Sequence, residues 1–412
     1  MQTDLLVVGA GPAGLACART AHDRGLAVEV IDKAVFPRDK TCGDGLTTQA
    51  LRLLERLGVD VTNQPGYQAI TETVIFSPRG RSITLPLPEQ SQGAYSGVMA
   101  RVDLDFALLQ RTRDSGVLVR EGVGLKSLSV GTQSVTAGLS DGNNIVAKYL
   151  VAADGHWSSV RRLQLGRKQK DLGSWHAVRQ YFCNVESPTN KPAQWIFFEP
   201  DILPGYAWVF SLPNGRANVG FTVLRREHQH GKDLRALWED LVNRLPLRSV
   251  LGENAEPEEN HRAWPIPASY HPSRCAQGRV LYVGDAAGVV DPLTGEGIAQ
   301  ALETGILAGE AIQTNQPPEQ VSSRYQQAVE RGIGRDLRFA KRFQRLLHSP
   351  ARAEAGLRIA AGTAWTRRNF ARWMFEDYPR AMAITPDRWR RGMFSEPGAF
   401  CARPIADKNC LG

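Results

Sequence analysis

The pattern of apolar and polar positions divides the chain into three regions with different periods. Short apolar runs typical of buried strands occur at 4–8, 27–31 and 279–283, each followed by glycines or an acidic residue. Residues 166–270 instead alternate apolar and polar side chains in strand fashion. Beyond residue 330, Phe, Trp and Leu recur at helical spacing among arginines. The pattern predicts an α/β region, an antiparallel sheet and a helical C-terminal tail.

The middle region contains four alternating segments, at 177–185, 194–199, 206–212 and 216–223. The last two are separated by Pro213-Asn214-Gly215, which is typical of a hairpin turn. We expect these segments to form one antiparallel sheet.

The N-terminal glycines have the context of a dinucleotide site. Gly9, Gly11 and Gly14 form a GxGxxG pattern between a strand and a helix, and the second strand, 27–31, ends at Asp32. The separation from Gly11 to Asp32 is close to the ~20 residues expected for an acid that binds a ribose hydroxyl. A carboxylate at this position disfavours a 2′-phosphate. The segment therefore predicts FAD or NAD rather than NADP.

A second strand–bend–helix lies far along the chain. The strand at 279–283 delivers Asp285 into a glycine-rich bend, and a helix begins near Ala299. The aspartate can accept hydrogen bonds from hydroxyls, and a helix start offers unpaired N–H groups and a positive dipole end. Two such devices suggest one long cofactor that is held at both ends.

Three further motifs support a family resemblance: Cys42-Gly43-Asp44-Gly45, Arg101-Val-Asp-Leu-Asp105 and Asp154-Gly155. With them, the chain resembles FAD-dependent oxidoreductases of the hydroxylase-like glutathione-reductase class. Within that class it is most similar to the geranylgeranyl reductase family, which includes menaquinone side-chain reductases. The resemblance covers about residues 1–330. It implies an α/β fold, with an FAD-binding Rossmann-like domain, an antiparallel-sheet substrate domain and a C-terminal helical tail.

The resemblance also implies a domain division. We assign 1–75, 96–165 and 271–330 to a discontinuous FAD-binding domain, 76–95 and 166–270 to the β substrate domain, and 331–412 to a basic helical C-terminal region.

Cofactor contacts follow position by position from the same resemblance. The implied FAD-binding residues are Gly9, Gly11, Ala13 and Gly14 at the pyrophosphate, Asp32 at the adenosine ribose, Val123 at the adenine, Arg101 at the phosphates or ribityl chain, Cys42, Gly43 and Gly45 beside the isoalloxazine, Asp285 at the ribityl or pyrophosphate end, and Gly297 and Ile298 at the flavin pyrimidine. Reduced flavin carries negative charge near N1 and O2, which a helix N-terminus stabilises.

The substrate side rests on Tyr206-x-Trp208-x-Phe210 followed by Gly220, which resembles the family motif that lines a lipid-substrate tunnel. Ser211 stands where the family usually has proline, and this departure leaves the identity of the substrate open. The same aromatic residues are also compatible with an ordinary core face of the sheet. Tyr206, Cys42 and water are the candidate proton donors. We interpret Asp105 as a helix-cap or turn acid, and we expect no metal site.

The resemblance predicts an FAD-dependent oxidoreductase. We expect reduction of carbon–carbon double bonds in an isoprenoid chain, either a geranylgeranyl lipid or a menaquinone side chain, by hydride transfer from reduced FAD. Two alternatives stay open: an FAD monooxygenase acting on an aromatic or polyketide-like molecule, and a non-catalytic flavin-binding membrane adaptor. A flavin halogenase is disfavoured because no lysine occurs between Lys40 and Lys126.

The reductant is less defined than the flavin. No second glycine-rich nucleotide motif occurs, so NAD(P)H would bind without a domain of its own. A reduced flavodoxin- or ferredoxin-type donor is equally compatible with the sequence.

Charge and composition place the remaining expectations. The net charge is +8, and residues 331–412 contribute seventeen Lys/Arg against seven Asp/Glu. Basic helices with tryptophans suit an anionic membrane surface, but the same helices could simply pack on the FAD-binding domain. No nucleic-acid-binding module accompanies the charge. The six cysteines lack the spacing of a disulfide framework or a metal site, and Cys410 does not form a prenylation box. We recognise no apolar stretch long enough to span a membrane and no secretory signal segment. We expect a cytoplasmic protein with a C-terminal region suited to peripheral membrane contact.

Overall fold

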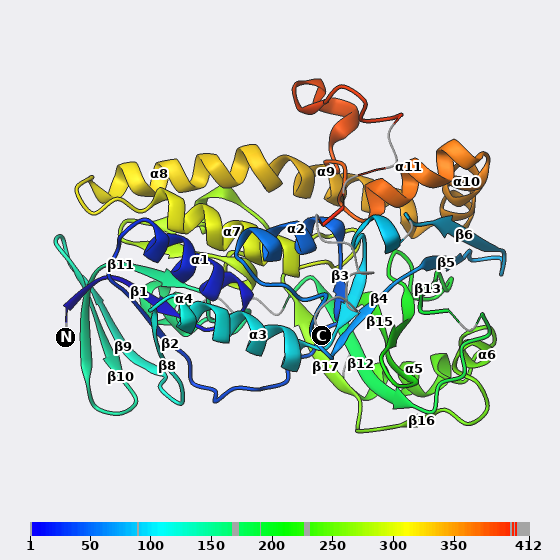
Figure 1. Ribbon diagram of the computed structural model, residues 1–412, viewed down its shortest axis with the longest axis horizontal. Coiled ribbons are helices and arrows are strands. Elements are labelled where there is room, and N and C mark those ends of the chain that lie inside the picture. The colour runs from blue at the N-terminus through cyan, green and yellow to red at the C-terminus, as the bar shows by residue number, and fades with distance from the viewer. Residues whose placement is uncertain are drawn as a thin grey trace, which may run out of the picture.

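The computed structural model describes residues 2–88, 90–166, 173–189, 191–225, 231–395, 398 and 400–401. Two large sheets lie side by side, with most of the long helices along one side of the molecule (Figure 1). Cys410 lies outside the described residues. The architecture is the predicted α/β fold, with a second, mainly antiparallel sheet and a helical C-terminal region.

The first sheet has a parallel core of Rossmann type. Strands from both ends of the first 330 residues pair in it, and these pairings are parallel. Its parallel strands are, in spatial order, β8 (Leu118–Arg120), β2 (Val28–Ile31), β1 (Gln2–Val8), β11 (Asn144–Ala152) and β19 (Val280–Tyr282). Antiparallel additions are β9 (Leu125–Val130), β10 (Val135–Leu139) and β18 (Ala276–Gln277). The predicted strands at 4–8, 27–31 and 279–283 are confirmed.

Two helices bring the glycine devices together. Helix α1 (Pro12–Asp23) follows β1, and α7 (Ile298–Ala311) follows the bend after β19. A Cβ atom at Gly305 would lie 2.2 Å from the carbonyl oxygen of Ala13, so only glycine allows this approach. The two helices therefore pack closely, with the first turn of α1 against the middle of α7.

The second sheet is mixed. In spatial order it contains β16 (Glu256–Pro257), β12 (Trp175–Cys183), β15 (Arg216–Leu224), β14 (Ala207–Leu212), β13 (Ala193–Phe197), β5 (Glu72–Phe76) and β6 (Ser82–Pro86), with β17 (Arg262–Ile266) also on β12. The predicted hairpin joins β14 and β15, and Asn214 and Gly215 have φ values of 62° and 68°. The predicted antiparallel pairing is confirmed among the four strands β12, β13, β14 and β15, whereas β5 pairs with β13 in parallel.

The predicted domain division stays a prediction. Its division between 75 and 76 falls within β5, which pairs with β13 along its whole length. Helices α5 (Gly231–Leu241) and α6 (Leu247–Leu251) bury apolar side chains against the second sheet, including Trp238 beside Phe221.

A small third sheet links the two large ones. It consists of β3 (Gly45–Leu46), β7 (Gly97–Met99) and β4 (Tyr67–Ala69), and it is flanked by α2 (Thr48–Arg56) and α3 (Arg101–Asp114). Helix α4 (Ser159–Leu165) follows β11. The Cys42 loop runs into β3, so this connection fixes its position between the sheets.

The helical tail is confirmed, and it packs on the body of the protein. Its helices, after α8 (Pro318–Val329) and a π-helical turn at 330–334, are α9 (Arg335–Gln344), α10 (Pro350–Ala361) and α11 (Ala364–Met374). Arg380 pairs with Asp291 at 3.0 Å, and both side chains are almost fully buried. Asp377 pairs with Arg52 of α2. Across the described residues, no helix combines the length and apolarity needed to span a bilayer.

Candidate functional site

The glycine loop after β1 is built from positions that exclude side chains. Gly9 has a φ of 111°, and a Cβ atom there would lie 2.3 Å from the carbonyl oxygen of Ala153. A Cβ atom at Gly14 would lie 1.9 Å from the carbonyl oxygen of Gly9. At Gly11 the nearest contact would be Nη2 of Arg38, 3.7 Å away. Gly9 and Gly14 thus shape the turn, while Gly11 faces space beside a cation.

Asp32 stands where the sequence places it, at the end of β2. Its two carboxylate oxygens accept hydrogen bonds from the N–H groups of Ala10 (2.7 Å) and Ala34 (2.8 Å). The N–H of Val123 donates to the carbonyl oxygen of Asp32 at 2.8 Å. The structure therefore brings Gly9, Asp32 and Val123 together at one edge of the sheet.

Cations and carboxylates gather beside Gly11. Arg101 forms a bidentate pair with Asp105 at 2.7 and 2.8 Å, and Arg38 lies 3.0 Å from the same carboxylate. Asp105 is fully buried within α3, so its interpretation as a cap or turn residue was wrong: it holds two arginines in place. Lys40 lies over the Trp264 ring at 4.3 Å. Burial lowers the pKa of Lys40, and nearby Asp285 opposes this shift.

The predicted strand–bend–helix at 279–299 is confirmed. Asp285 lies in a 3₁₀ turn, Gly284–Ala287, and α7 begins at Ile298. The N–H of Ile298 donates to Oε1 of Glu296 at 2.8 Å. A flavin contact by Ile298 stays a prediction, and it would require Glu296 to release this N–H. The helix start therefore presents a carboxyl group as well as the Gly297 backbone.

The Cys42 loop is fastened to the second sheet through Asn218 of β15. The Asn218 amide donates to the carbonyl oxygen of Cys42 (2.9 Å) and to Oδ2 of Asp44 (2.7 Å). Tyr181 donates to the same Asp44 oxygen at 2.6 Å. Asp44 has a φ of 64° and is fully buried. One polar side chain thus sets both the path of the loop and the orientation of Asp44.

Arg179 supports the Cys42 loop through its contacts with Tyr181 and Asp39. It is fully buried, lies 3.9 Å from the centroid of the Tyr181 ring and pairs with Asp39 at 2.8 Å. Burial raises the pKa of the Asp44 carboxyl to about 6, although hydrogen bonds from Tyr181 and Asn218 oppose the shift. A charged network therefore lies directly behind the predicted isoalloxazine loop.

An aromatic wall faces the same loop. The rings of Tyr206, Trp208 and Phe210 follow one another at centroid separations of 6.0 Å. A Cβ atom at Gly43 would lie 3.6 Å from Trp208, and the Trp208 indole donates to Asn218 at 2.9 Å. Gly220 is required behind this wall, since a Cβ atom there would lie 2.4 Å from Trp208. The structure thus brings the predicted substrate residues and the Cys42 loop face to face.

The two predicted catalytic residues are both held in the protonated form. Burial, reinforced by Asp44, raises the pKa of the Cys42 thiol to about 11. Burial and nearby Glu296 raise the pKa of Tyr206 well above its usual range. The Tyr206 hydroxyl donates a hydrogen bond to the carbonyl oxygen of Thr294. Tyr206 therefore ties the aromatic wall to the bend before α7.

A group of buried carboxyls borders this bend. Oδ1 of Asp291 accepts the N–H groups of Leu293 (2.7 Å) and Thr294 (3.1 Å), while Oδ2 pairs with Arg380. Glu376, with a φ of 60°, accepts hydrogen bonds from Thr47 (2.9 Å) and Gln300 (2.6 Å). Glu376 of the C-terminal tail thereby connects Thr47, at the start of α2, with Gln300 of α7.

Sequence reasoning missed several of these residues. Asn218 could have been identified from the sequence, because it is a polar residue within an apolar strand. In the sheet it lies opposite Tyr181 and Phe210. The missed group comprises Arg38, Lys40, Arg179, Tyr181, Asn218, Glu296, Glu376 and Arg380.

Comparison with sequence families and curated proteins gives a consistent result. A family model described as an FAD binding domain matches residues 2–312. A menaquinone reductase of Mycobacterium tuberculosis is 33% identical over 371 residues, which cover 84% of this chain and 84% of that protein. A digeranylgeranylglycerophospholipid reductase of Methanopyrus kandleri is 26% identical over 368 residues, covering 86% and 89%.

Solved structures share the fold. A geranylgeranyl bacteriochlorophyll reductase-like protein from Thermoplasma acidophilum superposes with a TM-score of 0.76 at 20% identity, covering 94% of this chain and 99% of that chain. The flavin-dependent brominase Bmp2 has a TM-score of 0.74 at 19% identity, covering 94% and 98%. The fold is thus shared by reductases and halogenases, and the chemistry has to be argued from the site.

Proposed function

The chain belongs to the geranylgeranyl reductase family of FAD-dependent oxidoreductases, and from this membership we propose that it reduces carbon–carbon double bonds of an isoprenoid chain. The substrate class is a geranylgeranyl lipid or the side chain of a menaquinone, as the names of its relatives suggest. Such an alkene has no activating carbonyl group. The protein must therefore position it closely and exclude water around it.

The residues of the site fit FAD. Gly11 leaves open space beside Arg38, and Arg101 lies in the same cationic group, as a pyrophosphate requires. We assign the adenosine end to Asp32 and Val123, and the flavin end to the Cys42 loop and the start of α7. When bound and reduced, FAD would supply the hydride for one alkene carbon.

The aromatic wall opposite the Cys42 loop is the observation that carries the proposal. A Cβ atom on Gly43 would lie 3.6 Å from Trp208 and 3.7 Å from Phe210, so the wall faces this loop at close range, and Tyr206 is hydrogen-bonded to Thr294 before α7. An apolar surface of this kind suits a hydrocarbon chain better than a polar aromatic acid. It supports an isoprenoid substrate, and hydroxylation of a small aromatic molecule remains the competing outcome of the test.

Anaerobic reoxidation of the flavin tests the proposal. FAD-loaded protein is reduced with dithionite, mixed with geranylgeranyl diphosphate, which carries no quinone, and followed by the return of oxidised-flavin absorbance. We expect reoxidation without oxygen. The aromatic hydrocarbon naphthalene, which lacks an isolated alkene, is the matched control. A strict oxygen requirement with a hydroxylated product would favour the monooxygenase. NAD(P)H and a flavodoxin-type protein are then compared as donors in place of dithionite.

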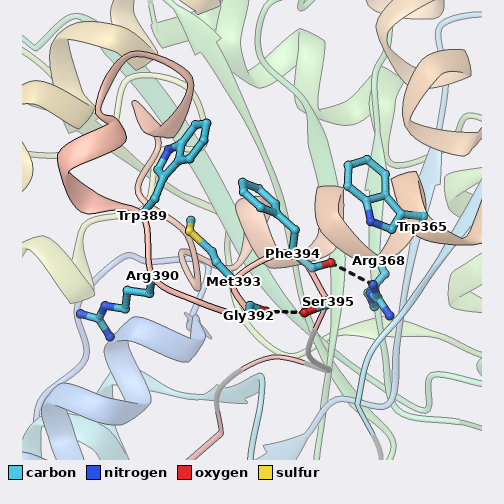
Figure 2. Close-up of a pocket in the computed structure, with 8 residues that line it drawn as sticks. All are labelled: Trp365, Arg368, Trp389, Arg390, Gly392, Met393, Phe394 and Ser395. Atoms are coloured by element: carbon cyan, nitrogen blue, oxygen red, sulfur yellow. Dashed lines mark hydrogen bonds between the residues drawn. The ribbon is translucent and has the colours of Figure 1, made fainter.

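The C-terminal region offers a surface suited to a membrane. A cavity of about 650 Å³ is lined by two tryptophans, Trp365 and Trp389, with Phe394 between them and Arg368 and Arg390 at its border (Figure 2). Trp365 and Trp389 are each about half exposed. Aromatic side chains beside guanidinium groups suit the interface of an anionic bilayer. We propose peripheral contact here, since an isoprenoid substrate would reside in the membrane.

Replacing Trp365 and Trp389 together with alanine should weaken binding to vesicles of phosphatidylglycerol and phosphatidylcholine roughly tenfold or more, because two interfacial anchors are lost. Flotation of the full-length protein measures the effect. Trp157→Ala is the control, since Trp157 is also about half exposed but lies in the FAD-binding part of the chain. Equal flotation of all three proteins would remove the membrane from the proposal.

A further inference from the structure

Three carboxyl groups meet between the bend before α7 and the C-terminal tail: Asp291, Glu296 and Glu376. Arg380 lies 3.0 Å from Asp291 and 3.7 Å from Glu376. Within the described part of the chain, it is the one cation that forms an ion pair with this group. A single guanidinium cannot neutralise three enclosed carboxylates, so at least one carboxyl keeps its proton at neutral pH.

Glu296 is the member best placed to hold that proton. Burial raises the pKa of the Glu296 carboxyl to about 8, and the neighbouring Glu376 and Asp291 add to the shift. The N–H groups of Ile298 (2.8 Å) and Ala299 (3.3 Å) oppose it, and both donate to Oε1. Since Oε1 is occupied as an acceptor, the proton belongs on Oε2.

Gln300 gives an independent sign of a protonated carboxyl. Its side chain is 5% exposed and donates through Nε2 to Glu376 at 2.6 Å. Its carbonyl oxygen is buried and has no donor among the described residues. Buried acceptors of this kind are rarely left unpaired, and a protonated carboxyl next to it would supply the missing donor.

The other candidate donors in the site are less suitable. The Tyr206 hydroxyl is engaged in a hydrogen bond to the carbonyl oxygen of Thr294, and burial raises the pKa of the Cys42 thiol to about 11. Glu296 lies in the same bend as Thr294, to whose side-chain oxygen its N–H donates at 3.3 Å, so it stands beside the end of the aromatic wall that Tyr206 forms. Resting on the proposed function, we infer that Glu296 is the catalytic acid that protonates the alkene carbon opposite the one that receives the hydride.

The proton and electron balance is simple. The hydride for one carbon would come from reduced FAD when it is bound, which would thereby be oxidised by two electrons. The O–H bond of Glu296 breaks, the π electron pair of the alkene forms the second C–H bond, and Glu296 becomes a carboxylate. A proton from solvent then restores the Glu296 carboxyl. The reductant class is NAD(P)H or a flavodoxin-type donor, replaced by dithionite in the test.

The Glu296→Gln variant is the matched test, because a glutamine carbonyl can still accept both N–H groups at the start of α7. Infrared difference spectra of wild-type and variant protein, with oxidised FAD and no substrate, report the protonated carboxyl directly. We expect its C=O band at neutral pH in the wild type and in Glu319→Gln, an exposed control, and its absence in Glu296→Gln. We also expect flavin reoxidation by geranylgeranyl diphosphate to slow roughly 100-fold or more, with unchanged FAD affinity.

The pH dependence of stability and of the reoxidation rate gives a second test. Folded Glu296 keeps its proton at pH values where the unfolded chain has released it, so apoprotein stability falls as pH rises from the ordinary carboxyl range to about 8. This part of the slope should disappear in Glu296→Gln. The wild-type reoxidation rate should likewise fall above the pKa of the acid.

Two outcomes separate the inference from the proposed function. An active wild type together with an equally fast Glu296→Gln variant overturns the donor role alone. Wild-type protein that binds FAD but reduces no isoprenoid overturns the proposed function and the donor role with it. A missing infrared band in the wild type contradicts the protonation state.

Discussion

Replacing Arg380 with alanine should destabilise the protein by about 3–5 kcal/mol and release FAD from what remains folded. Arg380 and Asp291 are 3% and 1% exposed, so the variant leaves a carboxylate buried without its cation. Asp291 also fixes the backbone at Leu293 and Thr294, where the Tyr206 hydroxyl is bound. Denaturant unfolding followed by fluorescence measures the loss of stability, and FAD titration measures the loss of affinity.

An exposed ion pair of the same tail provides the control for Arg380. Arg335 pairs with Asp387 at 3.0 Å, but the two side chains are 41% and 62% exposed. Arg335→Ala should change stability by no more than about 1 kcal/mol. Adding Asp291→Asn to Arg380→Ala should recover part of the loss, because the uncompensated charge is removed. A stability loss below about 1 kcal/mol for Arg380→Ala would contradict an integral role for the tail.

Replacing Gly11 with valine should weaken FAD binding roughly 100-fold or more, equivalent to about 2.7 kcal/mol, while the protein still folds. Gly11 has an ordinary extended backbone, with a φ of −81°, and among the described residues other than its chain neighbours the atom nearest to a Cβ atom there is 3.7 Å away. The added methyl groups would instead occupy the space assigned to the pyrophosphate. Fluorescence titration of apoprotein with FAD measures the affinity, and circular dichroism measures the fold.

Two further glycines separate cofactor binding from folding. Gly14→Ala places a methyl group 1.9 Å from the carbonyl oxygen of Gly9, so we expect lost stability as well as lost FAD. Gly356→Ala on α10 meets no atom within 4 Å and should leave both properties nearly unchanged. Normal FAD affinity in Gly11→Val would place the pyrophosphate elsewhere.

The parts of the fold that follow from local signals were predicted well. Both strand–turn–helix units and the hairpin at 213–215 are encoded by neighbouring residues, and each is confirmed. The parallel pairing of β5 with β13 was missed because its partners lie more than 100 positions apart. Alternation shows which face of a strand is buried, but it does not identify the neighbouring strand.

The site shows the same limit. Asp44 was visible as a member of the Cys42 motif, but its partners Tyr181 and Asn218 come from distant strands. The link between Arg380 and Asp291 joins positions 89 residues apart. A count of charges in the tail indicated a solvated or membrane-facing helix, whereas the arginine that matters most is buried. Charge pairing of this kind depends on tertiary packing and leaves no local pattern.

The central claim is that the site formed by the Cys42 loop, the start of α7 and the aromatic wall reduces an isolated double bond. Its most direct test is mass spectrometry of the lipid after one anaerobic turnover with dithionite-reduced protein in deuterated water. The proposed reaction predicts geranylgeranyl diphosphate that has gained two deuterium atoms on carbon per reduced bond and no oxygen. An unchanged lipid, or a product that contains added oxygen and forms only in air, would contradict it.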